Sequence, residues 1–426
     1  VPPAVDAAGL DRLLAQGAEA WRARYDATHG GFGEAPKLPE PELLRFLLRS
    51  PAHREMALRT LTAIVDGGIR DQLDGGFFKQ ANDAAWRLPY LQKNLADQAR
   101  LALVLLDAAK VTKEGNFGEL ATRTLGFVLV HFGDPASGFT ATHDATEEKL
   151  AASYAWTLDE LEKMLGKGEA RAFARTFGVT AEGNIPEDGY PGFNLAGKNI
   201  LYRATPRKGS VAEGGLAQST RKLLYVRRHR AAPRVDPTAT AGAHGLILGA
   251  FARGSVELRE PHFKDTAWKI LSYIRTRLRT PDGGLRRMAG SDAPAAPDDY
   301  ALVIDGLLAL HAATGDAEAM TYAQSLRAEA DRQFFDAKTG RYFSSRAAVA
   351  PGVWARVHVP TPSTGELPSA EATMALAFTS HASFAGKPAA EMALLAAALA
   401  AEAGESAEPP RGELLLALQS YRQKNP

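Results

Sequence analysis

The sequence predicts an all-α protein, an (α/α)6 toroid of helical hairpins linked by short β-hairpin turns. Apolar residues recur at the spacing of one helix face, as at Tyr300, Ile304 and Leu308, and long strand-like alternation is absent. Short glycine-aromatic elements separate the helical segments. Because a repeat of two helices and one such turn is typical of a ring of helical hairpins, we expect a ring with a ligand pocket at its centre.

The length of the chain leaves two architectures open, one closed toroid or two helical lobes, since 426 residues exceed the usual size of a single domain. Hydrophobic residues make up 45% of the chain and charged residues 23%, which is ordinary for a globular protein with a large core. We expect a single toroid domain over residues 1–426, with long loops near 181–215 and 347–368.

Apolar periodicity and glycine or proline punctuation mark the helices in order along the chain. The predicted helices cover residues 6–27, 40–50, 54–73, 89–111, 117–132, 158–177, 213–230, 238–256, 262–279, 298–313, 317–335, 369–382, 387–403 and 410–423. The stretch 181–215 is too rich in glycine and proline to be helical. We expect it to form a long loop or small hairpin across one mouth of the ring, and long loops are often functional.

Five glycine-containing elements lie between the helices. Glycine supplies the positive φ that a tight turn requires, and the bulky residue after it can close the end of a helical layer. Several follow an Asp or a Thr-His turn. The elements are 30–33 (GGFG), 75–78 (GGFF), 137–139 (SGF), 283–285 (GGL) and 340–343 (GRYF).

The charge balance argues against a partner held by long-range attraction to phosphate or anionic lipid, because 50 Lys and Arg face 49 Asp and Glu. We therefore expect no nucleic-acid partner. One local exception is a basic run, interpreted as a solvated helix face. Its members are Arg221, Lys222, Arg227, Arg228, Arg230 and Arg234.

The absence of cysteine excludes disulfides, thiolate catalysis and Cys-ligated zinc, and it suits both cytosol and periplasm. No stretch approaches the roughly 20 apolar residues of a membrane span. The N-terminal residues Val1, Pro2 and Pro3 lack the features of a signal peptide, so the chain is expected to be a mature product or a shortened one.

A family resemblance rests on two long sequence matches, 30–39 (GGFGEAPKLP) and 67–77 (GGIRDQLDGGF). Weaker matches continue in order to about residue 380. They are Asp83, Trp86 and 89–93, then 155–157 with Glu160, 183–184, 199–201, 298–301 and 368–369. Together these segments resemble the helical domain of the thioredoxin-domain-containing proteins related to spermatogenesis-associated protein 20, a family widespread in bacteria.

The resemblance implies an (α/α)6 barrel akin to six-hairpin glycosidases and N-acylglucosamine 2-epimerases, following an N-terminal thioredoxin-like domain that is missing here. The chain departs from the family at three polar segments. A family His-Phe-Glu-Lys run is replaced by 90–93 (YLQK), an Asp-Ala-Asp-Ser-Glu run by 143–147 (HDATE), and a Trp-Asn-Gly-Leu run by 243–246 (AHGL). The loss of a His and a Glu at one site indicates a divergent or degenerate member.

Sugar chemistry in such a toroid needs two carboxyl groups, one protonated and one ionised, or paired bases on opposite faces of a substrate carbon. The expected catalytic residues are Asp71, Asp144 and Asp299. The expected substrate-binding residues are Gln72, Trp86, Tyr90, His244 and Glu371.

Each candidate also has a structural interpretation. Asp71 can close the turn at 74–75, Trp86 and Tyr90 can fill core, and Asp144 can form a local turn beside His143. Asp298 and Asp299 either repel each other, which would raise one pKa, or cap the helix that follows.

The remaining candidates are equally ambiguous. His244 lies on an apolar stripe without a second His at i+4, so it suits a buried core histidine better than a zinc site. Glu371 can complement a helix dipole, and Lys37 can bind an anion or form a salt bridge.

No motif for nucleotides, serine hydrolysis or metalloproteolysis is present, and no metal or cofactor is expected. Two functional hypotheses follow. In the first, the protein is a glycosidase- or epimerase-like enzyme, with Asp144 or Asp299 as general acid and Asp71 as its partner. In the second, it is a non-catalytic interaction scaffold with a degenerate active site. The expected partners are a carbohydrate or peptide ligand, or another protein.

Overall fold

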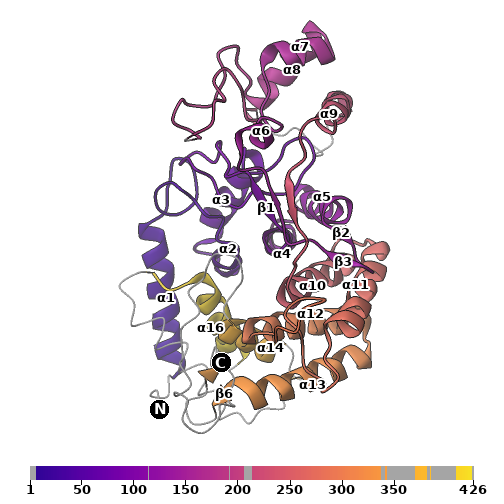
Figure 1. The fold of residues 1–426 in the computed structure, drawn as a ribbon. Coiled ribbons are helices and arrows are strands. Elements are labelled where there is room, and N and C mark those ends of the chain that lie inside the picture. Colours follow the sequence, from indigo (N-terminus) through magenta and orange to yellow (C-terminus); the bar gives the residue numbers. More distant parts are fainter. Residues whose placement is uncertain are drawn as a thin grey trace.

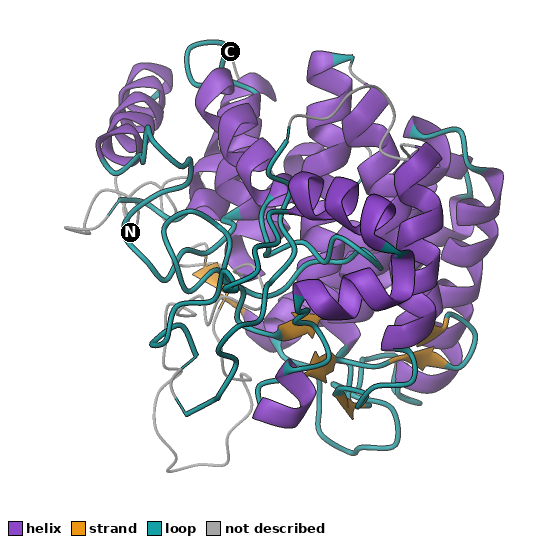
Figure 2. Ribbon diagram, turned by 90° about the horizontal axis from the view of Figure 1, so that it is seen from above, coloured by secondary structure: helices purple, strands orange, loops and turns teal. Residues whose placement is uncertain are grey.

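The fold was obtained as a computed structural model that describes residues 6–113, 115–190, 192–205, 214–336, 341–342, 370–380, 384 and 409–424. Helices dominate these residues, and the strands are short and lie among the loops on one side of the helical array (Figure 2). This confirms the predicted all-α class. None of the described helices has both the length and the apolar character needed to cross a membrane.

The longer helices form two sets, outer and inner, that alternate along the chain. The outer helices are α1 (Ala7–Ala23), α3 (Arg54–Asp66), α5 (Gly115–His131), α11 (Pro261–Tyr273, continued by a π turn, Ile274–Leu278) and α13 (Ala317–Phe334). The inner helices are α2 (Pro41–Leu48), α4 (Leu95–Thr112), α10 (Ala241–Glu257), α12 (Pro297–Thr314), α14 (Ala370–Ser380) and α16 (Gly412–Lys424).

The inner helices form a closed ring, because each contacts the next in the order α2, α4, α10, α12, α14, α16 and back to α2. The described outer helices each pack on one or more inner helices from outside. Helices α4, α10 and α12 are apolar on nearly all sides, as helices packed both outward and inward must be. The chain therefore has the predicted (α/α)6 toroid.

The two ends of the ring differ in loop length. Connections from an inner helix to the next outer helix are short, such as 49–53, 258–260 and 315–316, whereas connections from outer to inner helices are long, such as 24–40 and 67–94. Because the helices alternate in direction, all the long loops lie at the N-terminal ends of the inner helices. We call this end the mouth, and long loops in such a position are where function concentrates.

The glycine-containing elements repeat once per hairpin, in the loop from outer to inner helix. In each, a residue near the end of the outer helix pairs with the bulky residue of the element: Tyr25 with Phe32, Arg70 with Phe77, Gly133 with Phe139, Arg279 with Leu285 and Phe335 with Tyr342. All five bulky residues are buried. They close the helical layer as predicted, although residues 340 and 343 of the fifth element lie outside the described residues.

An insertion between α5 and α10 builds a second, smaller apolar core. Its helices α6 (Glu148–Ala151), α7 (Leu158–Leu165), α8 (Lys167–Phe177) and α9 (Gly214–Arg227) project from one end of the molecule, far from α13 and α14 (Figure 1). Trp156, Phe173 and Leu223 are fully buried in this core. Within the expected 181–215 loop, residues 181–190 and 192–205 contain no helix or strand, whereas Gly214 and Gly215 already belong to α9. The expected loop at 347–368 and helix at 387–403 lie outside the described residues.

The described residues also include seven short strands. They are β1 (Gln92–Asn94), β2 (Gly133–Asp134), β3 (Gly138–Phe139), β4 (Thr142–Asp144), β5 (Arg234–Asp236), β6 (Phe335–Asp336) and β7 (Arg341–Tyr342). Strands β1, β4 and β5 form an antiparallel sheet in that order. Since β1 runs directly into α4, this sheet lies at the mouth.

Three predicted helices differ from the structure. The helix expected over 89–111 begins only at Leu95, because residues 92–94 form β1. The helix expected over 158–177 is broken at Gly166, whose φ of +79° is incompatible with a helix. The helix expected over 54–73 ends at Asp66, because the chain at Gly67 passes against the backbone of Trp86.

The end of the ring opposite the mouth is held by half-buried ion pairs. The carboxylate of Asp107 on α4 accepts hydrogen bonds from Arg45 Nε at 2.8 Å and from Arg253 Nη2 at 2.6 Å, which joins α2, α4 and α10. These arginines hold the pKa of Asp107 well below its usual range, against the opposing effect of burial. Between Asp107 and Arg100 the residues of α4 are all apolar, so the inner helix is polar only toward its two ends.

Close packing of α10 on α12 gives a first prediction. A Cβ atom on Gly245 would lie 2.5 Å from the backbone of Leu302 and Val303, which cannot move aside. Gly245→Ala should therefore lower the free energy of unfolding by about 2 kcal/mol, although alanine is the better helix former. Gly126→Ala in α5, where a Cβ meets nothing within 4 Å, should instead stabilise by roughly 0.5–1 kcal/mol. Urea unfolding of both variants tests this, and equal effects would contradict it.

Candidate functional site

The mouth carries at least one buried or half-buried titratable side chain in the first turn of each inner helix. They are Glu42 on α2, Asp97 on α4, His244 on α10, Asp299 on α12, Glu371 on α14 and Glu413 on α16. Negative charge is favourable at a helix N-terminus, which explains the excess of acids. Within the described ranges, no three His, Asp or Glu side chains are grouped as metal ligands would be.

An ion network joins α2 to α4 at this end. Arg100 donates to both carboxylate oxygens of Glu42, from Nε at 2.9 Å and from Nη2, and its Nη1 lies 3.6 Å from Asp97 Oδ1. The side chains of Arg100 and Glu42 are about 10% exposed or less, so the pair is desolvated. Arg100 holds the pKa of Glu42 below its usual range, against the effect of burial, and Glu42 therefore carries its charge at neutral pH.

The sheet extends the network outward from the ring. Asn94 donates to Asp97 Oδ2 at 3.0 Å and accepts from Thr142 Oγ1 at 3.1 Å, while Gln92 donates to Asp144 Oδ2 at 3.1 Å. Directly paired and alternate residues in a strand pair share one face, so these five side chains form a continuous polar surface. Lys93 and His143 lie on the opposite face of the sheet.

Two further carboxyl groups, those of Glu40 and Glu413, lie near Glu42. Burial raises the pKa of Glu40 to about 7, and the charges of Glu413 and Glu42 raise it further, against the attraction of Arg100. Burial and the charge of Glu42 also raise the pKa of Glu413, against the attraction of Arg411, whose Nη1 lies 3.3 Å from Glu413 Oε1. Glu40 also has a φ of +49°, a strained value for a non-glycine residue.

The raised pKa of Glu40 makes a testable statement about stability. The folded protein holds this proton to about pH 7, whereas an unfolded glutamate releases it near pH 4.3, so wild-type stability falls as pH rises between these values. Glu40→Gln removes that loss. It should match the wild type near pH 4 and exceed it by about 1–2 kcal/mol near pH 8. A urea-unfolding difference that is the same at both pH values would show that Glu40 is already ionised when folded.

The structure takes Asp71 and Gln72 away from this surface. Asp71 is buried on the other face of the sheet, where Lys93 Nζ and Arg227 Nη1 each lie 2.9 Å from its carboxylate and keep its pKa well below the usual range despite burial. Gln72 donates to the carbonyls of Val65 and Gly67. The catalytic role expected of Asp71 stays a prediction, but its contacts favour a structural one.

Asp144 lies on the polar surface of the mouth and is half-buried. Burial opposes its charge, but hydrogen bonds from Thr146 and Gln92 lower its pKa, so it is ionised at neutral pH. Of the three expected catalytic residues, Asp144 is therefore the one that lies on this polar surface.

Asp299 lies at the first turn of α12 and is fully buried. It accepts from the backbone of Gly242 at 2.8 Å and of Ala296 at 3.0 Å, with Arg287 at 3.3 Å. Burial and the neighbouring charge of Asp298 raise its pKa to about 6. Both interpretations of the aspartate pair thus describe part of the result, since Asp299 bonds the backbone at the helix start and also has a raised pKa.

His244 and Glu371 are engaged by other parts of the fold. His244 Nε2 accepts from Phe139 N at 3.2 Å, Nδ1 lies 2.8 Å from Thr240 O, and the ring stacks on Tyr273 of outer helix α11. Burial lowers its pKa to about 4. Glu371 binds Arg341 through both oxygens and accepts from Tyr342 N. Ligand binding by either residue stays a prediction.

The expected aromatic platform is divided. Trp86 is fully buried, donates to Gly30 O at 3.1 Å and lies beside Lys37, whose Nζ binds Asp26 at 2.6 Å. Tyr90 is 36% exposed. Lys37 is thus the salt-bridged alternative rather than an anion site, and Trp86 fills the core of the loop layer.

Sequence reasoning missed Glu40, Glu42, Arg100 and Glu413. Two signals were available: Glu40 and Glu42 flank a proline that opens a helix, and Asp97 and Arg100 are spaced by three on an otherwise apolar helix. Neither signal shows that α2, α4 and α16 meet.

Comparison with known proteins supports this description of the fold. The chain is 28% identical to human spermatogenesis-associated protein 20 over 376 residues, covering 77% of the chain and 48% of the relative. It is also 28% identical to the mouse protein over 370 residues, covering 76% and 47% respectively. The chain thus spans about half the length of these curated relatives. Both are animal proteins, so they do not support a bacterial source. No family model matches the chain.

Solved structures with the same fold act on sugars. Cellobiose 2-epimerase from Bacillus thermoamylovorans has a TM-score of 0.56 at 10% identity, covering 98% of this chain and 99% of its own. A family 76 α-mannanase from Bacteroides thetaiotaomicron has a TM-score of 0.56 at 9% identity, covering 98% and 96%. An inactive α-1,6-mannanase variant from Salegentibacter, in complex with α-1,6-mannotriose, has a TM-score of 0.50 at 11% identity, covering 97% and 99%. At these identities the likeness shows the fold alone.

Proposed function

From its homology to spermatogenesis-associated protein 20 and its (α/α)6 fold, we propose that this chain is a carbohydrate-binding toroid that takes its ligand at the mouth. The observation that carries the proposal is the coexistence of protonated and ionised carboxyl groups there. Glu40, with a pKa of about 7, can donate a hydrogen bond or a proton, while the ionised Glu42 and Asp144 can only accept.

This mixture matches the chemistry of sugars, whose hydroxyl groups both donate and accept hydrogen bonds. Gln92, Asn94 and Thr142 add amide and hydroxyl groups to the same polar surface. Acid/base chemistry on a sugar likewise requires two carboxyl groups whose pKa values are pushed apart. If the protein is an enzyme, Glu40 is the proton donor that the pKa values favour, and Asp144 is the expected residue best placed to act as the base.

A non-catalytic scaffold is the second candidate, and a specific observation favours it. Asp71 is neutralised by two cations, and Asp299 is fully buried with its carboxylate accepting from two backbone N–H groups. Two of the three expected catalytic acids are therefore committed to holding the fold. In that case, the sugar chemistry of the structurally similar enzymes does not extend to this chain.

The binding proposal is tested by thermal unfolding with cellobiose, α-1,6-mannotriose and a wider oligosaccharide panel. A sugar that binds the folded protein raises its melting temperature by mass action. We expect a concentration-dependent rise with at least one sugar, reduced by Asp144→Asn, whereas Asp11→Asn on exposed α1 should leave it unchanged. No rise with any sugar would remove the carbohydrate proposal.

Turnover separates the two candidates. The protein is incubated with whichever sugar binds, and products are separated by chromatography. New products that disappear with Glu40→Gln, while binding persists, would establish an enzyme. Binding without products would establish the scaffold.

A further inference from the structure

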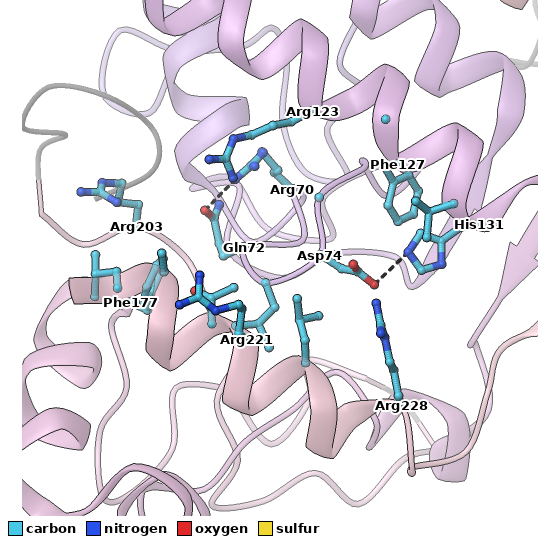
Figure 3. Close-up of a pocket in the computed structure, with 18 residues that line it drawn as sticks. Arg70, Gln72, Asp74, Arg123, Phe127, His131, Phe177, Arg203, Arg221 and Arg228 are labelled. Atoms are coloured by element: carbon cyan, nitrogen blue, oxygen red, sulfur yellow. Dashed lines mark hydrogen bonds and ion pairs between the residues drawn. The ribbon is translucent and has the colours of Figure 1, made fainter. Parts of the chain in front are cut away.

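A cavity of about 530 Å³ lies outside the ring, between outer helix α5, insertion helix α9 and the loop 70–75 (Figure 3). This volume is typical of sites for small molecules. Helical periodicity builds two walls. Along α9 the lining residues 217, 221 and 224 form one stripe, which Arg228 continues just past the end of the helix, and along α5 residues 123, 127 and 130–131 form another.

The cavity is strongly basic. Asp74 is the one acid among its described lining residues, and it is already paired, with His131 Nε2 at 3.0 Å and Arg227 Nη2 at 3.1 Å. The arginines that line the cavity come from the loop 70–75, from α5, from the segment that follows α8, and from α9 and the residue directly after it. Figure 3 shows them around one opening. They are Arg70, Arg123, Arg203, Arg221 and Arg228.

The basic run on α9 was interpreted from sequence as a solvated face, and the structure corrects this. Arg227 turns inward to Asp71, and Arg230 lies 3.7 Å from the ring centre of Trp156, because carboxylates and aromatic rings are within reach on that side. Arg221 and Arg228 remain exposed, and neither has an ion-pair partner among the described residues. Arg123 has only the exposed Glu119, at 3.0 Å.

Apolar side chains lie among the arginines on the same walls of the cavity. They are Phe127 on α5, Phe177 at the end of α8, and Leu216 and Leu224 on α9. A guanidinium group offers paired donors that match a phosphate, and several arginines around one cavity exceed the need of a single negative charge. Apolar side chains beside them accommodate the body of an organic molecule.

We propose that this cavity binds the di- or triphosphate group of a small molecule, with Arg221 and Arg228 as its principal contacts. The site lies outside the ring, apart from the polar surface formed by Gln92, Asn94, Asp97, Thr142 and Asp144, so it does not depend on carbohydrate binding. Inorganic pyrophosphate carries the recognised group alone, and ADP carries it on a flat organic body, so the two probes distinguish the sources of the same chemistry.

The test is isothermal titration calorimetry of the full chain with pyrophosphate and with ADP, at low and at physiological ionic strength. Both should bind, more weakly at the higher ionic strength, because the contacts are ionic. The variant Arg221→Gln/Arg228→Gln should bind at least about tenfold more weakly, since it loses two charged contacts. Its circular dichroism and melting temperature should equal those of the wild type, because both side chains are exposed.

The matched control is Arg171→Gln/Arg175→Gln, which removes the same charge from exposed positions of α8 outside the cavity. It should bind both probes as the wild type does. If ADP binds more tightly than pyrophosphate, the apolar side chains of the cavity contact the organic body of the ligand. If the two probes bind equally, the phosphates alone are recognised. Either result supports the proposal. No binding of either probe, no weakening by the cavity variant, or equal weakening by the two variants would overturn it.

Discussion

Replacing Arg100 with methionine should lower the free energy of unfolding by about 3–5 kcal/mol, which is among the largest effects expected for any single change in this protein. The substitution leaves Glu42 buried without its bidentate partner, and Asp97 loses a cation 3.6 Å away. A buried charge without a partner carries most of its desolvation cost, whereas the attraction that offset it is gone. Urea unfolding at neutral pH measures the loss.

The chain supplies a control with the same geometry and different burial. Arg422 binds both oxygens of Asp11, at 2.8 and 2.9 Å, but on the surface. Arg422→Met should therefore leave the unfolding free energy unchanged within error, because water screens exposed pairs. The double variant Arg100→Met/Glu42→Leu should recover much of the loss by replacing the ion pair with apolar contacts. A loss from Arg100→Met no greater than that from Arg422→Met would contradict the proposed network.

The helical class and the hairpin repeat could be predicted because both depend on local sequence. The period of apolar residues identified α4, α10 and α12 to within a few residues, apart from the start of α4. Glycine followed by a bulky residue identified the turn of each described hairpin, since positive φ and a buried plug are requirements within a few residues. Where prediction erred, a distant contact decided: α3 ends where its chain meets Trp86, which lies nineteen residues beyond Gly67.

The candidate site could be predicted only in part, because it is made by closure of the ring. Residues from α2, α4 and α16 meet only when the last helix of the chain returns to the first hairpin, and no spacing within the sequence encodes that meeting. Asp144 was found because its turn is local. Asp71 was predicted to be catalytic because the sequence does not show which side chains surround it in the fold. Its partners Lys93 and Arg227 lie 22 and 156 residues away.

Those partners make Asp71→Asn the second variant with a large expected effect. The side chains of Asp71 and Lys93 are 4% and 3% exposed, and that of Arg227 11%, so the two cations would be left facing each other in the interior with only Asp74 nearby. We expect a loss of about 3–5 kcal/mol at neutral pH. Asp11→Asn, the same change in an exposed pair, should have no measurable effect.

The pH dependence identifies the cause of that loss. In the wild type, the depressed pKa of Asp71 contributes stability above the unfolded value near 3.9, and this stability is lost as pH falls below it. In Asp71→Asn, Lys93 loses the charge that supports its proton, so its pKa, already lowered by burial, falls further. The unfolded chain then binds more protons than the folded one, and the variant should regain stability as pH rises above neutral toward the pKa of an unfolded lysine, about 10.4. A deficit that stays constant over this range would mean that lost hydrogen bonds, rather than the unpaired lysine, account for the effect, and Lys93→Met in the Asp71→Asn background would then fail to restore stability.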